Sequence, residues 1–208
     1  MTDNFSAYKQ FITEKWSYSD LPEDDSYFVV ELIRRGKDNP DKPAANYHFK
    51  NYYIRKPEDL DKYEQEIKSL CEMLRLRAYA SVNIKSFKQV SLDTMAELAR
   101  RIANNDYKKN YAVFESCSGQ YCHSGDKQWV VDLDDCKLHT EYPETVKELI
   151  NYCKPDGAKI VTEFPTKSGV HIITTPFDRQ QFIELCEEYD VKNADIKKNH
   201  LTLLYENL

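Results

Sequence analysis

The stretch Trp129-Val130-Val131-Asp132-Leu133-Asp134-Asp135 decides how the rest of the chain is interpreted. Its apolar residues predict a buried strand. Because side chains alternate along a strand, Val131 and Leu133 point to one face while Asp132 and Asp134 point to the other. Neighbouring carboxylates repel each other, so the pair is typical of a divalent-metal site or of acid–base chemistry. An acidic turn at the end of a strand gives the same pattern without a function.

The composition indicates a folded protein with a substantial core. The chain has 208 residues, of which 41% are hydrophobic and 12% aromatic. The net charge of −6 excludes a surface that is basic everywhere, although a local basic groove can still bind phosphates. The start of the chain is polar and no apolar run has the length of a membrane span. We therefore expect a cytoplasmic protein without membrane contact, whose six cysteines are thiols.

Apolar spacing and turn residues predict two lobes, an N-terminal α/β lobe over 1–110 and a second lobe over 111–208. The elements expected in the first lobe are a helix at 5–17, strands at 27–33 and 46–55, a helix at 57–74, a strand at 76–84 and a helix that Ser91 caps. This last helix carries an apolar stripe of Leu92, Met95, Leu98, Ala99 and Ile102. A cleft between the lobes is where we expect a ligand.

An irregular segment is expected at 105–128, and from Trp129 onward the second lobe has the order β-α-β-β-α-β. After the aspartate strand, the expected elements are a helix at 143–153, strands at 158–164 and 170–175, a helix that ends at Tyr189 and a last strand at 199–205. This order is the split βαβ plan of ferredoxin-like sheets. The sequence therefore predicts an α+β fold.

The second informative stretch is Lys167-Ser168-Gly169-Val170-His171. Gly169 permits a tight turn and lets a ligand approach the main chain. In a split βαβ sheet this hairpin can lie beside the aspartate strand, with His171 facing the same cleft as Asp132 and Asp134. Taken alone, a histidine at the mouth of a hairpin is more often hydrogen-bonded to a neighbour without further function.

In this order the residues resemble the archaeo-eukaryotic primase superfamily, the catalytic core of small primase subunits and primase-polymerases. Members carry a hydrophobic strand that ends in Asp-x-Asp, matched here by 130–134. A small residue followed shortly by His in a hairpin is matched by 168–171. A third acidic residue follows a helix, and Asp195 is the best match, with Asp190 as a competitor. The resemblance covers roughly residues 76–208, and the chain ends soon after the third motif, where family members usually continue.

The resemblance implies a palm-like catalytic core of the split βαβ (RRM/ferredoxin-like) type and two-metal nucleotidyl transfer. Asp132, Asp134 and Asp195 would hold Mg²⁺ or Mn²⁺. The residues expected to contact the nucleoside triphosphate are Lys167, Ser168, His171 and Arg77. Lys85 and Lys88 are candidates for template or primer phosphates, although for these two we favour a solvated face. A nucleic-acid template and a separate helicase or replication partner are the implied partners.

Three other interpretations remain open from the residues. The first is a structural zinc with Cys117, Cys122, His123 and Cys136 as ligands and His139 as a fifth possible ligand. The paired short spacings of zinc ribbons are missing from this set. The second is a catalytically inactive nucleic-acid or protein-binding module of the same fold. The third is a metal-dependent nuclease, which also uses clustered carboxylates with a histidine. Binding of a nucleoside triphosphate separates the transferase from the last two.

Overall fold

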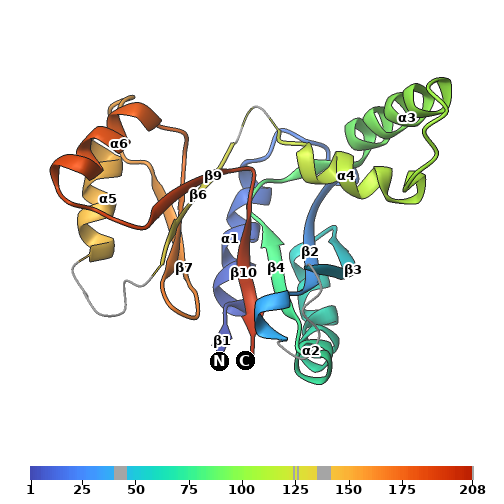
Figure 1. Ribbon diagram of the computed structural model, residues 1–208, viewed down its shortest axis with the longest axis horizontal. Coiled ribbons are helices and arrows are strands. Elements are labelled where there is room, and N and C mark those ends of the chain that lie inside the picture. Colours follow the sequence, from blue (N-terminus) through green and yellow to red (C-terminus); the bar gives the residue numbers. More distant parts are fainter. Residues whose placement is uncertain (40–45, 124, 126, 135–141, 208) are drawn as a thin grey trace.

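The computed structural model describes residues 1–39, 46–123, 125, 127–134 and 142–207. Within these ranges the protein is a mixed α+β structure with two antiparallel sheets and six α-helices (Figure 1). None of the described helices combines the length and the apolar composition that crossing a membrane requires.

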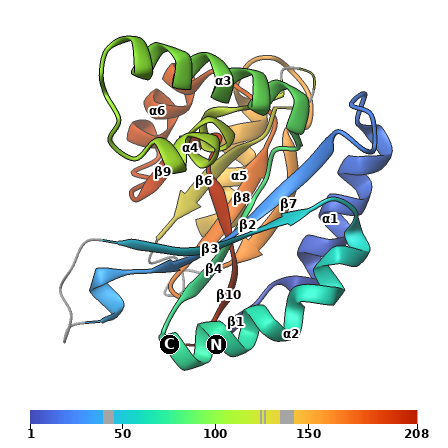
Figure 2. The same ribbon diagram turned by 90° about the vertical axis from the view of Figure 1, so that its right-hand side faces the viewer.

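The larger sheet has six strands and contains both ends of the chain. Its strands, in spatial order, are β1 (Thr2–Asp3), β10 (Leu201–Glu206), β4 (Arg77–Ser81), β2 (Ser26–Arg34) and β3 (Tyr47–Ile54), and β5 (Lys85–Ser86) pairs with the start of β2. Helices α1 (Phe5–Tyr18) and α2 (Pro57–Leu74) lie side by side along one face of this sheet, as Figure 2 shows. The predicted hairpin of β2 and β3 is confirmed.

The smaller sheet has four strands and carries the aspartate stretch at its centre. Its order is β7 (Ile160–Pro165), β8 (Val170–Thr174), β6 (Trp129–Leu133) and β9 (Ala194–Lys198). Helices α5 (Tyr142–Tyr152) and α6 (Arg179–Glu188) cover the face that points away from the larger sheet (Figure 1). The register places Asp132 directly opposite His171 on one neighbouring strand and opposite Asp195 on the other.

Alternate side chains of β6 point to opposite faces of the smaller sheet, as the sequence predicts. Val131 and Leu133 are fully buried in a cluster with the apolar residues of α5 and α6. Val130 points the other way, into a second cluster that contains Tyr8 and Phe11 of α1. Helix α1 therefore lies between the two sheets, and Asp132 shares the inner face of the smaller sheet with Val130.

The predicted last strand forms, but its expected place in the smaller sheet is wrong. As β10 it pairs with β1 and β4 in the larger sheet. The fourth strand of the smaller sheet is β9, which the sequence analysis did not separate from it. Asn199 between the two strands has a φ of 50°, and this left-handed turn directs the chain from one sheet to the other. Residues 201–206 of the predicted second lobe thus pair with strands of the first.

Two further elements differ from the prediction. Helix α3 (Phe87–Ala103) begins before Ser91, because Ser86 is its N-cap and the Ser86 Oγ accepts a hydrogen bond of 3.0 Å from the Gln89 N–H. The segment predicted to be irregular contains the 3₁₀ turn η2 (Asn110–Ala112) and helix α4 (Val113–Gln120). A second 3₁₀ turn, η1 (Gly36–Asp38), follows β2.

Candidate functional site

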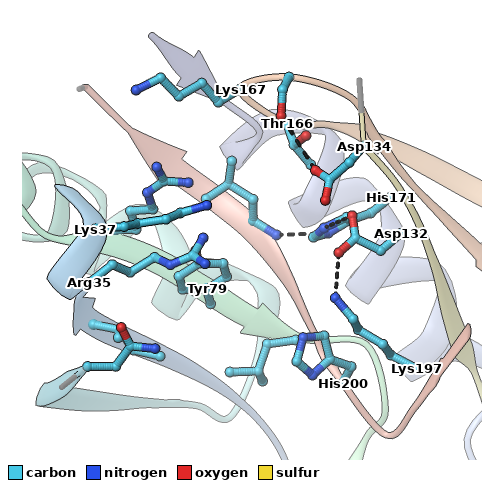
Figure 3. Close-up of a pocket in the computed structure, with 16 residues that line it drawn as sticks. Arg35, Lys37, Tyr79, Asp132, Asp134, Thr166, Lys167, His171, Lys197 and His200 are labelled. Atoms are coloured by element: carbon cyan, nitrogen blue, oxygen red, sulfur yellow. Dashed lines mark hydrogen bonds and ion pairs between the residues drawn. The ribbon is translucent and has the colours of Figure 1, made fainter. Parts of the chain in front are cut away.

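A cavity of about 310 Å³ opens between the two sheets and is lined by residues from both (Figure 3). From the smaller sheet come Asp132 on β6, His171 on β8 and Lys197 on β9. From the larger sheet come Tyr79 on β4 and the start of β10. The predicted cleft between two lobes thus corresponds to a cavity that is lined by both aspartates of the aspartate stretch.

The centre of the cavity is a cross-strand pair of Asp132 and His171. The His171 Nε2 lies 3.3 Å from the Asp132 Oδ1, and both side chains are largely buried. On its other side, the ring accepts a hydrogen bond at Nδ1 from the Leu203 N–H at 3.4 Å, and Thr202 Oγ1 lies 3.0 Å away. Because Nδ1 accepts, the ring proton is on Nε2 and points at the carboxylate.

Lys197 is the second partner of Asp132, and the sequence analysis did not single it out. Its Nζ lies 2.5 Å from the Asp132 Oδ2, so both carboxylate oxygens have a partner. Burial alone would raise the pKa of Asp132, but the hydrogen bonds from His171 and Lys197 outweigh it and hold that pKa well below its usual range. Asp132 is therefore an ionised carboxylate at neutral pH.

Asp134 stands at the mouth of the cavity, where β6 ends. Its carboxylate is exposed, and the Ser168 Oγ lies 3.5 Å from the Asp134 Oδ1. The turn that carries Ser168 approaches β6 closely because Gly169 has no side chain. A Cβ on Gly169 would lie 1.7 Å from the Leu133 carbonyl oxygen. The glycine thus makes room for the main chain of β6, a contact that the sequence analysis did not predict.

The wall opposite the carboxylates is cationic. Arg35, which follows β2, and Lys37, in the η1 turn, face the two aspartates Asp132 and Asp134 across the cavity (Figure 3). The Arg35 Nη1 donates a hydrogen bond of 3.1 Å to the Tyr79 hydroxyl. The sequence analysis missed both cations, although the run of positive residues in Arg34-Arg35-Gly36-Lys37, just after a predicted strand, was the available signal.

Two of the predicted nucleotide contacts differ in their surroundings. Lys167 lines the cavity from the turn before β8 and is exposed. Arg77 also lines it, but its guanidinium is buried in ion pairs, at 2.7 and 2.8 Å to Asp38 and at 3.0 Å to Glu206. With its N–H groups directed at two carboxylates, Arg77 is placed to hold β4, β10 and the η1 turn together.

The third predicted carboxylate lies beside the cavity and does not line it. Asp195 is opposite Asp132 in the register, on the same face of the sheet. Its side chain is 70% exposed, and its Oδ2 is 3.8 Å from the Lys197 Nζ. The competitor Asp190 is in the turn after α6, where it pairs with Lys192 at 3.0 Å. The register therefore favours Asp195 over Asp190.

The two lysines proposed for template phosphates have different environments. Lys85 is buried, and its Nζ donates to the carbonyl oxygens of Ser118 at 2.6 Å and Tyr121 at 3.2 Å. Burial lowers the pKa of Lys85 to about 8. Both readings of Lys85, as a phosphate contact and as part of a solvated face, are wrong. Lys88 is exposed.

The proposed zinc ligands fall partly outside the described residues. Cys117 and Cys122 are half-buried near α4, and the His123 Nε2 lies 2.6 Å from the Asp20 carboxylate. Cys136 and His139 are not among the described residues, so the zinc set stays a prediction. In the part of the chain that the structure describes, no three His, Cys, Asp or Glu side chains surround a common metal position.

No family model, curated protein or solved structure matches this chain. The residues that line the cavity include five cations (Arg35, Lys37, Arg77, Lys167 and Lys197) and two carboxylates. Arg77 is paired with Asp38 and Glu206, and Lys197 with Asp132, so Arg35, Lys37 and Lys167 are the cations that favour an anionic ligand beside the carboxylates.

The carboxylate pair also fits a hard divalent cation. Mg²⁺ and Mn²⁺ prefer oxygen ligands, and Asp132 and Asp134 are presented to the same cavity from one strand. The ammonium of Lys197 lies against the Asp132 Oδ2, so a metal ion at this oxygen would have to displace it. Asp132 and Asp134 would hold the ion, whereas Asp195 is opposite Asp132 in the register but does not line the cavity.

Proposed function

We propose that this protein is a metal-dependent nucleotidyltransferase of the primase-polymerase type, which acts on nucleoside triphosphates and a nucleic-acid template. The observation that carries the proposal is the cavity with Asp132, Asp134 and His171 on one wall and Arg35 and Lys37 on the other. Such a site combines metal-binding oxygens with cations that suit a triphosphate. Template binding, and a separate helicase or replication partner, belong to the same proposal.

The topology supports this proposal. The elements β6-α5-β7-β8-α6-β9 form a sheet of order β7-β8-β6-β9, in which every neighbouring pair is antiparallel. We infer a split βαβ core of the ferredoxin-like, palm type, since the two βαβ units interleave in this order. The aspartate strand is then a central strand, and the hairpin with His171 lies next to it.

The residues of the chain have separate tasks in this mechanism. Bound Mg²⁺ or Mn²⁺ would activate the attacking hydroxyl and neutralise charge on the leaving pyrophosphate. Lys167, Arg35 and Lys37 bind the triphosphate and orient it along the cavity. His171 carries its proton on Nε2, so it can donate to a phosphate oxygen once it turns from Asp132. The Ser168 hydroxyl, beside Asp134, is positioned for the same ligand.

The first test is calorimetric titration of the chain with a nucleoside triphosphate, with and without Mn²⁺. Asp132→Asn and Asp134→Asn should each weaken metal-dependent binding by at least about tenfold, because each removes a charged ligand oxygen. Asp190→Asn is the matched control and should bind like the wild type, since Asp190 lies in the turn after α6. Metal-dependent binding would then be followed by a primer-extension assay.

The inactive binding module is the second candidate, and one observation favours it. Both oxygens of Asp132 are already engaged by His171 and Lys197, which is the arrangement of a structural carboxylate. If neither the wild type nor the variants bind the triphosphate, but the wild type binds single-stranded nucleic acid without metal, the transferase proposal is wrong. Metal-dependent cleavage of nucleic acid without triphosphate binding would assign the site to a nuclease.

A further inference from the structure

An edge of strand β10 in the larger sheet reaches the candidate site. Strand β1 pairs with β10 at Tyr205 and Glu206, and Leu203 lies beyond that pairing. There the Leu203 carbonyl accepts a hydrogen bond of 2.8 Å from the Asn4 side chain, and the Leu203 N–H donates one of 3.4 Å to the His171 Nδ1. The main chain of the larger sheet therefore holds a site residue of the smaller sheet.

The hydroxyl of Thr202 is the second group that contacts this ring nitrogen. Thr202 is fully buried, and its Oγ1 lies 3.0 Å from the His171 Nδ1. A neutral imidazole carries a proton on one nitrogen and a lone pair on the other. If Nδ1 carried the proton, the Leu203 N–H would face a second donor. The Thr202 hydroxyl therefore donates to Nδ1 as well, and both donors favour the tautomer whose proton is on Nε2.

Thr202 contacts His171 from behind the cavity. Its neighbours Leu201 and Leu203 line the cavity and Thr202 does not, because side chains alternate along a strand. His171 and Asp132 lie together on the wall of the cavity, as Figure 3 shows. A change at Thr202 therefore reaches a bound ligand only through His171.

We propose that Thr202 is a positioning residue that fixes the tautomer of His171 and so holds the Nε2–H toward the cavity. In the structure this N–H faces the Asp132 Oδ1, 3.3 Å away, and a phosphate oxygen of a ligand would accept the same proton. A ring with its proton on Nδ1 would instead direct a lone pair at the ligand and repel it. The tautomer is a property of the chain itself, whereas its benefit for a triphosphate rests on the proposed function.

The experiment is ¹⁵N nuclear magnetic resonance of the full chain with labelled histidine, recorded without metal or nucleotide. Long-range proton–nitrogen spectra distinguish a protonated ring nitrogen from one with a lone pair, and His171→Gln identifies the signals of this ring among the five histidines. The wild type should carry the proton on Nε2. Thr202→Val removes the hydroxyl at nearly constant volume and should raise the ratio of the Nδ1–H to the Nε2–H tautomer by about tenfold. Thr202→Ser keeps the hydroxyl and should retain the wild-type ratio.

Thr174→Val is the matched control for Thr202→Val. Thr174 is also fully buried on a strand, and its hydroxyl has no hydrogen-bond partner among the described residues. The same exchange there should leave the tautomer of His171 unchanged. Thr202→Ala, a second variant without the hydroxyl, should reproduce the shift of Thr202→Val.

Three results would overturn the proposal. One is a wild-type ring with its proton on Nδ1, and another is an unchanged tautomer ratio in Thr202→Val and Thr202→Ala. The third is an equal shift in Thr174→Val, which would assign the effect to packing in general.

Titration with a nucleoside triphosphate and Mn²⁺ separates this inference from the proposed function. If both hold, Thr202→Val should weaken triphosphate binding by about three- to tenfold, and Thr202→Ser should bind like the wild type. The predicted tautomer shift in a chain whose wild type binds no triphosphate would contradict the proposed function and still support the positioning of His171 by Thr202.

Discussion

At the scale of single residues, the decisive contact is that of Lys197 with Asp132. An ammonium 2.5 Å from the Asp132 Oδ2 competes with any divalent ion for that oxygen. Lys197→Met removes the competing charge and should therefore tighten Mn²⁺ binding, measured by electron paramagnetic resonance without nucleotide, by about tenfold. Binding of the triphosphate to the Mn²⁺-loaded variant should weaken, because the cavity loses one of its cations.

Lys198→Met provides the matched control for Lys197. Its ammonium lies 4.8 Å from the centre of the Trp129 ring, so the substitution removes the same charge from the neighbouring position while leaving Asp132 untouched. Mn²⁺ affinity should stay close to that of the wild type. Equal tightening in both variants would show a general effect of net charge, and weaker Mn²⁺ binding in Lys197→Met would contradict competition for Asp132.

Residue-level patterns predicted the acidic wall of the site better than the cationic one. Asp132 and His171 could be placed on one face because strand periodicity fixes the direction of each side chain. Arg35 and Lys37 could not be assigned, since they reach the cavity only through the pairing of β2 with β4 and the meeting of two sheets. The partners in β2 and β4 are up to 50 positions apart, as in Val30 with Ala80, and the two walls of the cavity are further apart still, so local sequence does not encode these contacts directly.

At the scale of elements, the close approach of the β8 turn to β6 can be tested through Gly169. Gly169→Ala places a Cβ within 1.7 Å of the Leu133 carbonyl oxygen, so the turn or β6 has to move. We expect a loss of about 1–3 kcal/mol in the free energy of unfolding, as for other overpacked positions. Denaturant titration of the variant and the wild type measures this free energy. Gly119→Ala in α4 is the control, because a new Cβ there meets no atom within 4 Å. This substitution should stabilise the helix slightly, since alanine has the higher helix propensity.

Element boundaries show where the sequence was ambiguous. Strand β9 was missed because it is five residues long and is separated from β10 only by Asn199 and His200. Its alternation of Ala194 and Ile196 with charged residues was the available signal. The stripe on α3 was predicted correctly as a helical pattern, but periodicity gives the position of an apolar face and not the partner that covers it.

At the scale of the whole molecule, α1 and the residue before it contact both sheets. The Asn4 side chain before it donates to the Pro165 carbonyl of β7 at 2.9 Å and to the Leu203 carbonyl of β10 at 2.8 Å. Within α1, the Phe11 ring meets the fully buried Phe164 of β7 edge-on, with centroids 5.8 Å apart. One hydrophobic cluster thus contains residues of both sheets. We therefore expect a substitution that destabilises one sheet to lower the stability of the other as well.

This coupling predicts the effect of a substitution made far from α1. Phe177 packs in the separate cluster under α6, and Phe177→Ala should cost about 3–5 kcal/mol. Trp16, in α1, reports on the other side of the molecule once Trp129 is replaced by Phe. In that background, Phe177→Ala should shift the fluorescence transition of Trp16 and the circular-dichroism transition to the same lower denaturant concentration. The opposite result is a Trp16 transition at the wild-type denaturant concentration together with a circular-dichroism transition in two steps. It would show that the two sheets unfold separately and that the shared cluster around α1 is too weak to couple them.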